Sequence, residues 1–181
     1  MDAWLTHALL EGHPYVFRSC GGDPNGFLKE FRSAWSLLPT EVREKILQFW
    51  ASRPYPPIIE LSDVWSPKAA VGQVRHTGQE LKFRAECFLL FRTKAAQWII
   101  AHELAHLYQK ALGRPPGGES EEKNEAEANE FARSWGFDDS EANLLVFYAS
   151  MHDVPWSEAC SVIYGILPDG RQPRRKSKPQ P

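Results

Sequence analysis

The stretch KAAQWIIAHELAHLYQKAL, residues 94–112, decides how this chain of 181 residues is organised. Its apolar side chains recur at helical spacing, which predicts a long helix with a buried face. Within it lies the pattern H-E-x-x-H, formed by His102, Glu103 and His106. Residues four apart lie on one face of a helix, so both imidazoles can point at a single ion. The stretch therefore predicts a helix that carries a candidate metal site.

The chemistry of these side chains favours zinc. Neutral imidazole nitrogens bind Zn²⁺ at about 2.0–2.1 Å. Glu103 follows His102 by one residue and projects about 100° further round the helix. That direction is wrong for a third ligand but within reach of a water held on the metal. We therefore predict that Glu103 is a general base, which takes a proton as this water attacks a carbonyl.

A third ligand is expected from the acidic segment that follows. Catalytic zinc usually takes three protein ligands, and no histidine lies between His106 and His152. The helix predicted over 120–135 is rich in glutamate, and Glu125 lies on its apolar stripe, three residues before Ala128. A carboxylate that faces inward needs a partner, for which a cation is well suited. Glu125 is therefore the candidate third ligand.

These two segments together resemble a known group of enzymes. HELAH at 102–106 followed by EAEANEFA at 125–132 is similar to the gluzincin zinc metallopeptidases, and closest to the ImmA/IrrE type of phages and bacteria. The similarity covers about residues 94–135. It implies a zincin-like domain with Glu125 as the third zinc ligand, and Glu127 is the register-shifted alternative.

The resemblance also implies an activity. It points to a zinc metallopeptidase that hydrolyses peptide bonds of a protein substrate. Members of this group often cut a regulatory DNA-binding protein, which is an analogy of substrate only. The alternative is a non-catalytic protein-binding module of zincin ancestry that keeps its metal for stability.

One further catalytic candidate lies outside the motif. A developing oxyanion needs a donor besides the metal. His152 is the best candidate, because it ends a predicted helix and Asp153 beside it could orient its ring. Tyr108, Tyr148 and Tyr164 are better explained by packing.

The surrounding segments predict an α+β fold, with a small antiparallel or mixed sheet packed on helices. Period-two alternation predicts a strand over 80–91, which we expect to run along the cleft and pair with substrate backbone, and shorter strands are predicted over 58–61 and 73–76. Helical spacing predicts helices from Asp23-Pro24, from Thr40, and over 94–112, 120–135, 140–151 and 156–165. The first twenty residues show no clear pattern.

No repeat or long linker divides the chain, so we expect one domain over residues 1–168. Its first part, residues 1–57, is predicted to be helical, and residues 58–168 form the metallopeptidase core. Residues 169–181 are basic, rich in proline and predicted to be disordered.

Charge limits the partners that the chain can bind. The last eleven residues hold five of the 21 basic residues and no acid, so the remainder carries a net charge of −7. An acidic body argues against a broad nucleic-acid surface, and only the tail could contact phosphates, weakly.

Composition is that of an ordinary globular protein, with 43% hydrophobic and 24% charged residues. No apolar run is long enough to span a membrane, and the N-terminus lacks the pattern of a secretion signal. Three widely spaced cysteines indicate neither a disulfide framework nor a cysteine zinc site. We therefore expect a cytoplasmic protein.

Overall fold

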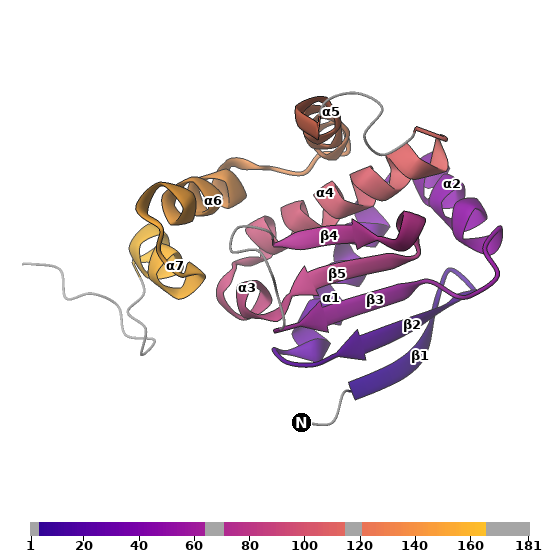
Figure 1. The fold of residues 1–181 in the computed structure, drawn as a ribbon, viewed down its shortest axis with the longest axis horizontal. Helices are drawn as coiled ribbons and strands as arrows, with labels where there is room; N and C mark the ends of the chain where they lie inside the picture. Colours follow the sequence, from indigo (N-terminus) through magenta and orange to yellow (C-terminus); the bar gives the residue numbers. More distant parts are fainter. Residues whose placement is uncertain (1–3, 64–70, 115–120, 166–181) are drawn as a thin grey trace, which may run out of the picture.

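A mixed five-stranded sheet and seven α-helices make up the α+β fold of the computed structural model, which describes residues 4–63, 71–114 and 121–165 (Figure 1). The strands are β1 (Trp4–Leu10), β2 (His13–Ser19), β3 (Ile58–Ser62), β4 (Gly72–Arg75) and β5 (Glu80–Arg84). The helices are α1 (Pro24–Leu37), α2 (Thr40–Ala51), α3 (Ala85–Leu90), α4 (Thr93–Ala111), α5 (Glu121–Ser134), α6 (Ser140–His152) and α7 (Trp156–Tyr164).

The sheet has the order β1-β2-β3-β5-β4. Its three central strands are parallel, and β1 and β4 pair antiparallel at the two edges. The backbone N–H of Arg84 donates to the carbonyl of Val71 at 2.9 Å. Because successive residues of a strand direct their backbone groups to opposite sides, those of Gly72 and Val74 point to the outer edge. Within the described residues, no strand pairs with these outward groups of the edge strand β4.

The main core lies between one face of the sheet and the helices α1, α2 and α4. Phe83 of β5 contacts Phe27 of α1, with ring centroids 5.1 Å apart. Trp35 and Trp50 stack between α1 and α2 at 6.1 Å, and the Trp50 indole donates to the Gly78 carbonyl at 3.0 Å. Figure 1 shows α1 and α2 behind the sheet and α4 along its β4 edge. These contacts fix the position of α4 beside the edge strand β4.

The prediction of a strand over 80–91 was wrong in its second half. The strand ends at Arg84, and α3 follows directly. In helical form Phe88 packs edge-on against Phe27 at 4.8 Å, and Leu89 points outward with 60% of its surface exposed. The apolar residues of 85–90 fit a strand pattern, but they also suit a short helix that packs on an aromatic cluster, and the helix is what forms.

The prediction that residues 1–57 are helical was also wrong at the start of the chain. Strands β1 and β2 form a hairpin, in which Leu10 pairs with His13. The two turn residues, Glu11 and Gly12, have φ values of 49° and 82°. Positive φ at both central residues matches the right-handed twist of paired strands. Because β2 also pairs with β3, this segment belongs to the same sheet as the later strands.

The remaining elements follow the predictions closely. The Asp23 side chain accepts a hydrogen bond from the Gly26 N–H at 3.1 Å and caps α1 as expected. The second helix begins at Thr40 as predicted, and Pro39 rather than Thr40 occupies its N-cap position. Gly113 and Gly136 follow α4 and α5 with φ values of 78° and 92°, as helix stops require.

The predicted basic tail, residues 169–181, lies outside the described residues. Among the helices of the described ranges, none is long and apolar enough to cross a membrane.

Candidate metal centre

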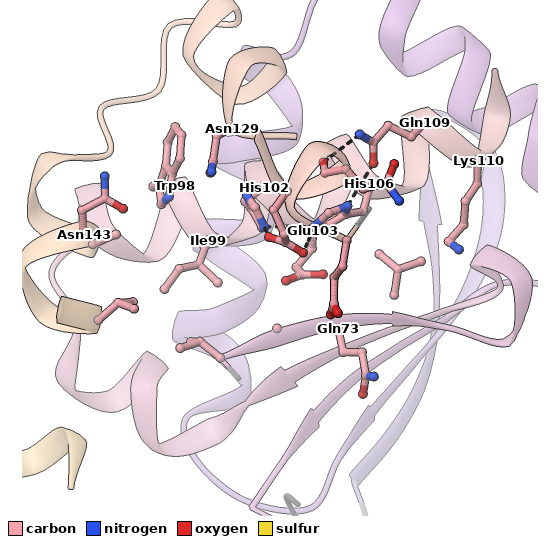
Figure 2. Close-up of a pocket in the computed structure, with 18 of the residues that line it drawn as sticks. Gln73, Trp98, Ile99, His102, Glu103, His106, Gln109, Lys110, Asn129 and Asn143 are labelled. Atoms are coloured by element: carbon pink, nitrogen blue, oxygen red, sulfur yellow. Dashed lines mark hydrogen bonds and ion pairs between the residues drawn. The ribbon is translucent and has the colours of Figure 1, made fainter. Parts of the chain in front are cut away.

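The two histidines of α4 point to one place. His102 and His106 are one helical turn apart, and their Nε2 atoms lie 3.1 Å from each other. Their rings are nearly perpendicular, with centroids at 4.6 Å. Figure 2 shows both rings above the strand that carries Gln73. The spacing predicted from the sequence therefore brings the two nitrogens together.

Glu125 of α5 completes the group. Its Oε2 lies 3.1 Å from the Nε2 of His102, and its Oε1 lies 3.2 Å from the Nε2 of His106. A tetrahedral ion with bonds of about 2.0–2.1 Å places neighbouring ligand atoms about 3.3–3.4 Å apart. The observed separations approach this value, so the donor set fits a zinc ion.

Small residues let α5 approach α4. Ala128 and Ala132 are fully buried, and no side chain there holds the helices apart. At the outer end of the contact, Tyr108 of α4 meets Phe131 of α5 and Trp135, the residue after α5, edge-on, with ring centroids 5.3 and 5.9 Å away. This packing fixes the rotation of α5 and so directs Glu125 at the histidines.

Gln109, which the sequence reasoning missed, sets the protonation of His106. The Gln109 amide nitrogen donates to the Asn124 carbonyl at 3.0 Å and to the Glu127 carboxylate at 2.8 Å. Its Oε1 must therefore accept from the Nδ1–H of His106, at 3.0 Å. With the proton on Nδ1, the Nε2 of His106 keeps its lone pair for a metal. A polar residue three positions after the second histidine was the signal available.

The same contacts decide between the two candidate glutamates. Glu127 accepts from Gln109 and forms an ion pair with Arg114, so its carboxylate is turned away from the imidazoles. Glu125 alone of the two meets both rings. The geometry favours Glu125 and leaves Glu127 as part of the support around the ligands.

Glu103 lies buried beside this group, with 6% of its surface exposed. The β4 backbone covers it closely, because a methyl group built on Gly72 would lie 2.5 Å from its Cγ and Oε1. Only glycine permits this approach. The carboxylate thus lies in a narrow space between α4 and the edge strand β4.

The pKa values of the site residues follow from their burial and from the charged groups near them. Burial raises the pKa of Glu103, against the lowering effect of the two imidazoles. Hydrogen bonds from the rings of His102 and His106, which form when the rings are protonated, hold the pKa of Glu125 well below its usual range. Burial opposes protonation of His106, but Glu125 and Glu103 outweigh it and raise the pKa of this ring. The pKa values of two neighbouring carboxyl groups are therefore shifted in opposite directions, upward for Glu103 and downward for Glu125.

Within the candidate site as described, the buried Nδ1 of His102 has no hydrogen-bond partner. Asn129, one helical turn after Glu125, lines the same pocket near this ring (Figure 2). Its position suits a hydrogen bond to Glu125 or to an imidazole, but none joins it to either group in the described structure.

The ligand group opens into a cleft of about 850 Å³. Its walls come from α4, α5, α6 and the edge strand β4. Trp98, Ile99 and Val146 line the α6 end together with the amides of Asn129 and Asn143, and the charged Lys110 and Arg114 lie toward the opposite end. The candidate site is therefore accessible to an extended ligand.

His152 is not brought to this cleft. It is exposed at the end of α6, where its ring lies 4.4 Å from that of Tyr148, and it is absent from the described lining residues. Tyr164 donates from its hydroxyl to Glu141 at 2.6 Å, away from the ligand group. Neither residue takes part in the described site, and the tyrosine has a packing role, as expected.

Comparison with protein-family models gives no match, and neither do comparisons with the curated proteins and with the solved structures.

Proposed function

We propose that this chain is a zinc-dependent metallopeptidase with a zincin-like domain. His102, His106 and Glu125 would hold the ion, and Glu103 would act as general base. The observation that carries this proposal is the convergence of three ligand atoms beside a buried carboxylate at the wall of an open cleft. When bound, the ion would supply a Lewis acid that polarises a peptide carbonyl and acidifies a water molecule.

Glu103 is suited to two proton transfers. Its raised pKa allows it to take a proton from the attacking water and to deliver that proton to the leaving amine nitrogen. The β4 backbone at Gly72 limits the movement of its side chain. A carboxylate that only decorated a helix would need neither this burial nor this contact.

The substrate backbone would pair with β4. The sequence pointed instead to the strand over 80–91, but β5 is bordered by β3 and β4 and has no free edge. Gly72 and Val74 direct backbone groups outward, and Val71 to Val74 line the cleft. An extended peptide added antiparallel to this edge would place its carbonyl groups beside Glu103.

The three cysteines are free thiols, which is consistent with the proposed reducing, cytoplasmic setting. Weak contact of the basic tail with nucleic acid remains a prediction.

Metal analysis tests the ligand set directly. Protein purified without added zinc should hold about one equivalent of metal, and His102→Ala should lose most of it. His13→Ala is the matched control, because His13 lies exposed after the β1–β2 turn. Less than about half an equivalent in the unmodified protein, unchanged by His102→Ala, would count against the proposal.

Glu103→Gln separates a peptidase from a binding module that keeps metal for stability. As a peptidase, the variant should retain its metal and lose about 10²- to 10⁴-fold in peptide hydrolysis, measured on an unfolded protein substrate such as casein. Unchanged hydrolysis would exclude Glu103 as the base. No hydrolysis by either protein, with full metal content in both, would favour the binding module.

A further inference from the structure

A cation without a partner lies in the cleft. Lys110 of α4 lines the pocket and forms no hydrogen bond or ion pair with any described residue. Partial burial lowers its pKa, so its ammonium group is incompletely solvated. An ammonium held in this way gains from a counter-ion. The position of Lys110 therefore favours binding of a negatively charged ligand.

No neighbouring charged side chain among the described residues supplies a counter-ion to Lys110, and the two arginines nearby contact other side chains. Arg114, also at this end of the cleft, pairs with Glu127. Arg75 of β4 donates to the Gln73 side chain at 2.9 Å. Glu121 of α5 lines the same pocket, but no ion pair joins it to Lys110. Among the described lining residues, Lys110 is the cation that no side chain neutralises.

Helix geometry places Lys110 in line with the proposed base. It follows His106 by four residues and Glu103 by seven, so it lies on the same side of α4 as both. Seven residues of helix span about 10 Å along the axis. In Figure 2 its side chain extends from α4 on the strand side of the pocket.

We propose that Lys110 binds an acidic side chain of the peptide substrate, on the N-terminal side of the bond that is cut. This inference rests on the proposed function. An extended strand advances about 3.3 Å per residue, so a separation of about 10 Å corresponds to roughly three residues. The acidic residue would stand two to four positions from the cut.

The direction follows from the run of β4 beside α4. Gly72 lies against Glu103, and Gly78, just beyond the strand, lies near Leu107. The strand therefore runs the same way as α4, toward Lys110. A peptide that pairs antiparallel with β4 has its N-terminal half beside Lys110 and its C-terminal half toward α6.

The opposite end of the cleft has no cation among its described lining residues. Trp98, Ile99 and Val146 present apolar surface there, and the amides of Asn129 and Asn143 are neutral. A carboxylate placed at this end would lose hydration without gaining a counter-charge. The charge preference should therefore be confined to one side of the cut.

The test maps cleavage sites with the zinc-loaded full chain on a proteome-derived peptide library, read by mass spectrometry. The unmodified protein should enrich Asp and Glu two to four residues before the cut. Lys110→Met should lose this enrichment, and Lys110→Glu should favour Lys and Arg at the same positions. On a matched pair of peptides with Glu or Gln there, kcat/KM should differ roughly tenfold for the unmodified protein and little for Lys110→Met.

Lys45→Met is the matched control, because Lys45 is exposed on α2. It should keep the acidic preference. Metal content and circular dichroism of the Lys110 variants should equal those of the unmodified protein. Cleavage without an acidic preference, or a preference that survives in Lys110→Met, would overturn the role of Lys110 alone. No cleavage of any peptide by the metal-loaded protein would overturn the peptidase and this inference together.

Discussion

At the scale of single residues, Gln109 is predicted to support metal binding without being a ligand. It joins His106 to α5 through three hydrogen bonds and has 5% of its surface exposed. Gln109→Leu should weaken zinc binding about 10- to 100-fold, since the Nδ1–H of His106 loses its acceptor. Competition with a chelator measures this. The control is Gln97→Leu on the same helix, whose amide contacts Glu30 and Ser33 instead; an equal effect of both changes would contradict the role of Gln109.

Glu103 gives a second residue-scale prediction, on stability. Burial raises its folded-state pKa above the ordinary value of 4.5, so its favourable contribution is present below that value and is lost as the pH rises through the folded-state pKa. Because glutamine does not ionise, Glu103→Gln removes this loss of stability at high pH. In a chelator, the variant should melt at a higher temperature than the unmodified protein at pH 8, and the difference should shrink toward pH 4.5. A lower melting temperature at pH 8 would contradict the cause given.

The residues that could be read from the sequence are those whose geometry is local. His102, Glu103 and His106 share one helix, so their relative directions follow from its period. Glu125 could be singled out because a carboxylate on an apolar stripe needs a partner. The position of Gln109 three residues after His106 was a local hint, but its hydrogen bonds to α5 and the contact of Gly72 with Glu103 depend on how α5 and β4 approach α4, which no local pattern encodes.

At the scale of elements, the site depends on the closeness of β4 to α4. Gly72→Ala would place a methyl group on the Glu103 side chain and push the strand or the carboxylate away. We expect peptide hydrolysis to fall by about tenfold or more with little change in metal content, since the ligands lie elsewhere. Gln73→Ala, at the next position of the strand, should keep most of the activity. Normal hydrolysis by Gly72→Ala would show that this contact is dispensable.

At two places the spacing of hydrophobic residues does not predict the element that forms. Residues 85–90 alternate as a strand would, yet form α3, because Phe88 gains contacts with the α1 aromatic cluster. The β1–β2 hairpin went unrecognised because Glu11-Gly12 is a weaker turn signal than Asn-Gly. In both places tertiary packing outweighs local preference. The longer helices, with full apolar stripes and clear stop signals, were predicted to within one or two residues.

At the scale of the whole molecule, metal should stabilise one part more than the rest. Among described elements α5 packs chiefly on α4, whereas α1 and α2 share the core with the sheet. Removing metal should therefore speed amide hydrogen exchange in α5 and leave α1 nearly unchanged. Mass spectrometry with and without chelator measures this. Equal acceleration in both helices would indicate that the ligand group supports the entire fold.

Thiol reactivity tests the packing of α3 against α7. Cys87 and Cys160 are buried on these helices, and burial raises the pKa of Cys160 to about 12. Only exposed Cys20 should react rapidly with Ellman's reagent in the native protein, and all three should react after denaturation. Cys20→Ser should abolish the fast reaction. Two or more fast thiols would contradict the position of α3.

The division of ligands between α4 and α5 has a consequence for how an ion would be held. Two imidazoles and the neighbouring carboxylate belong to a helix that the core already holds, and the remaining oxygen comes from an outer helix. If the proposed ion binds, the core would hold two of its ligands in place without it, and the third would depend on the packing of α5 against α4.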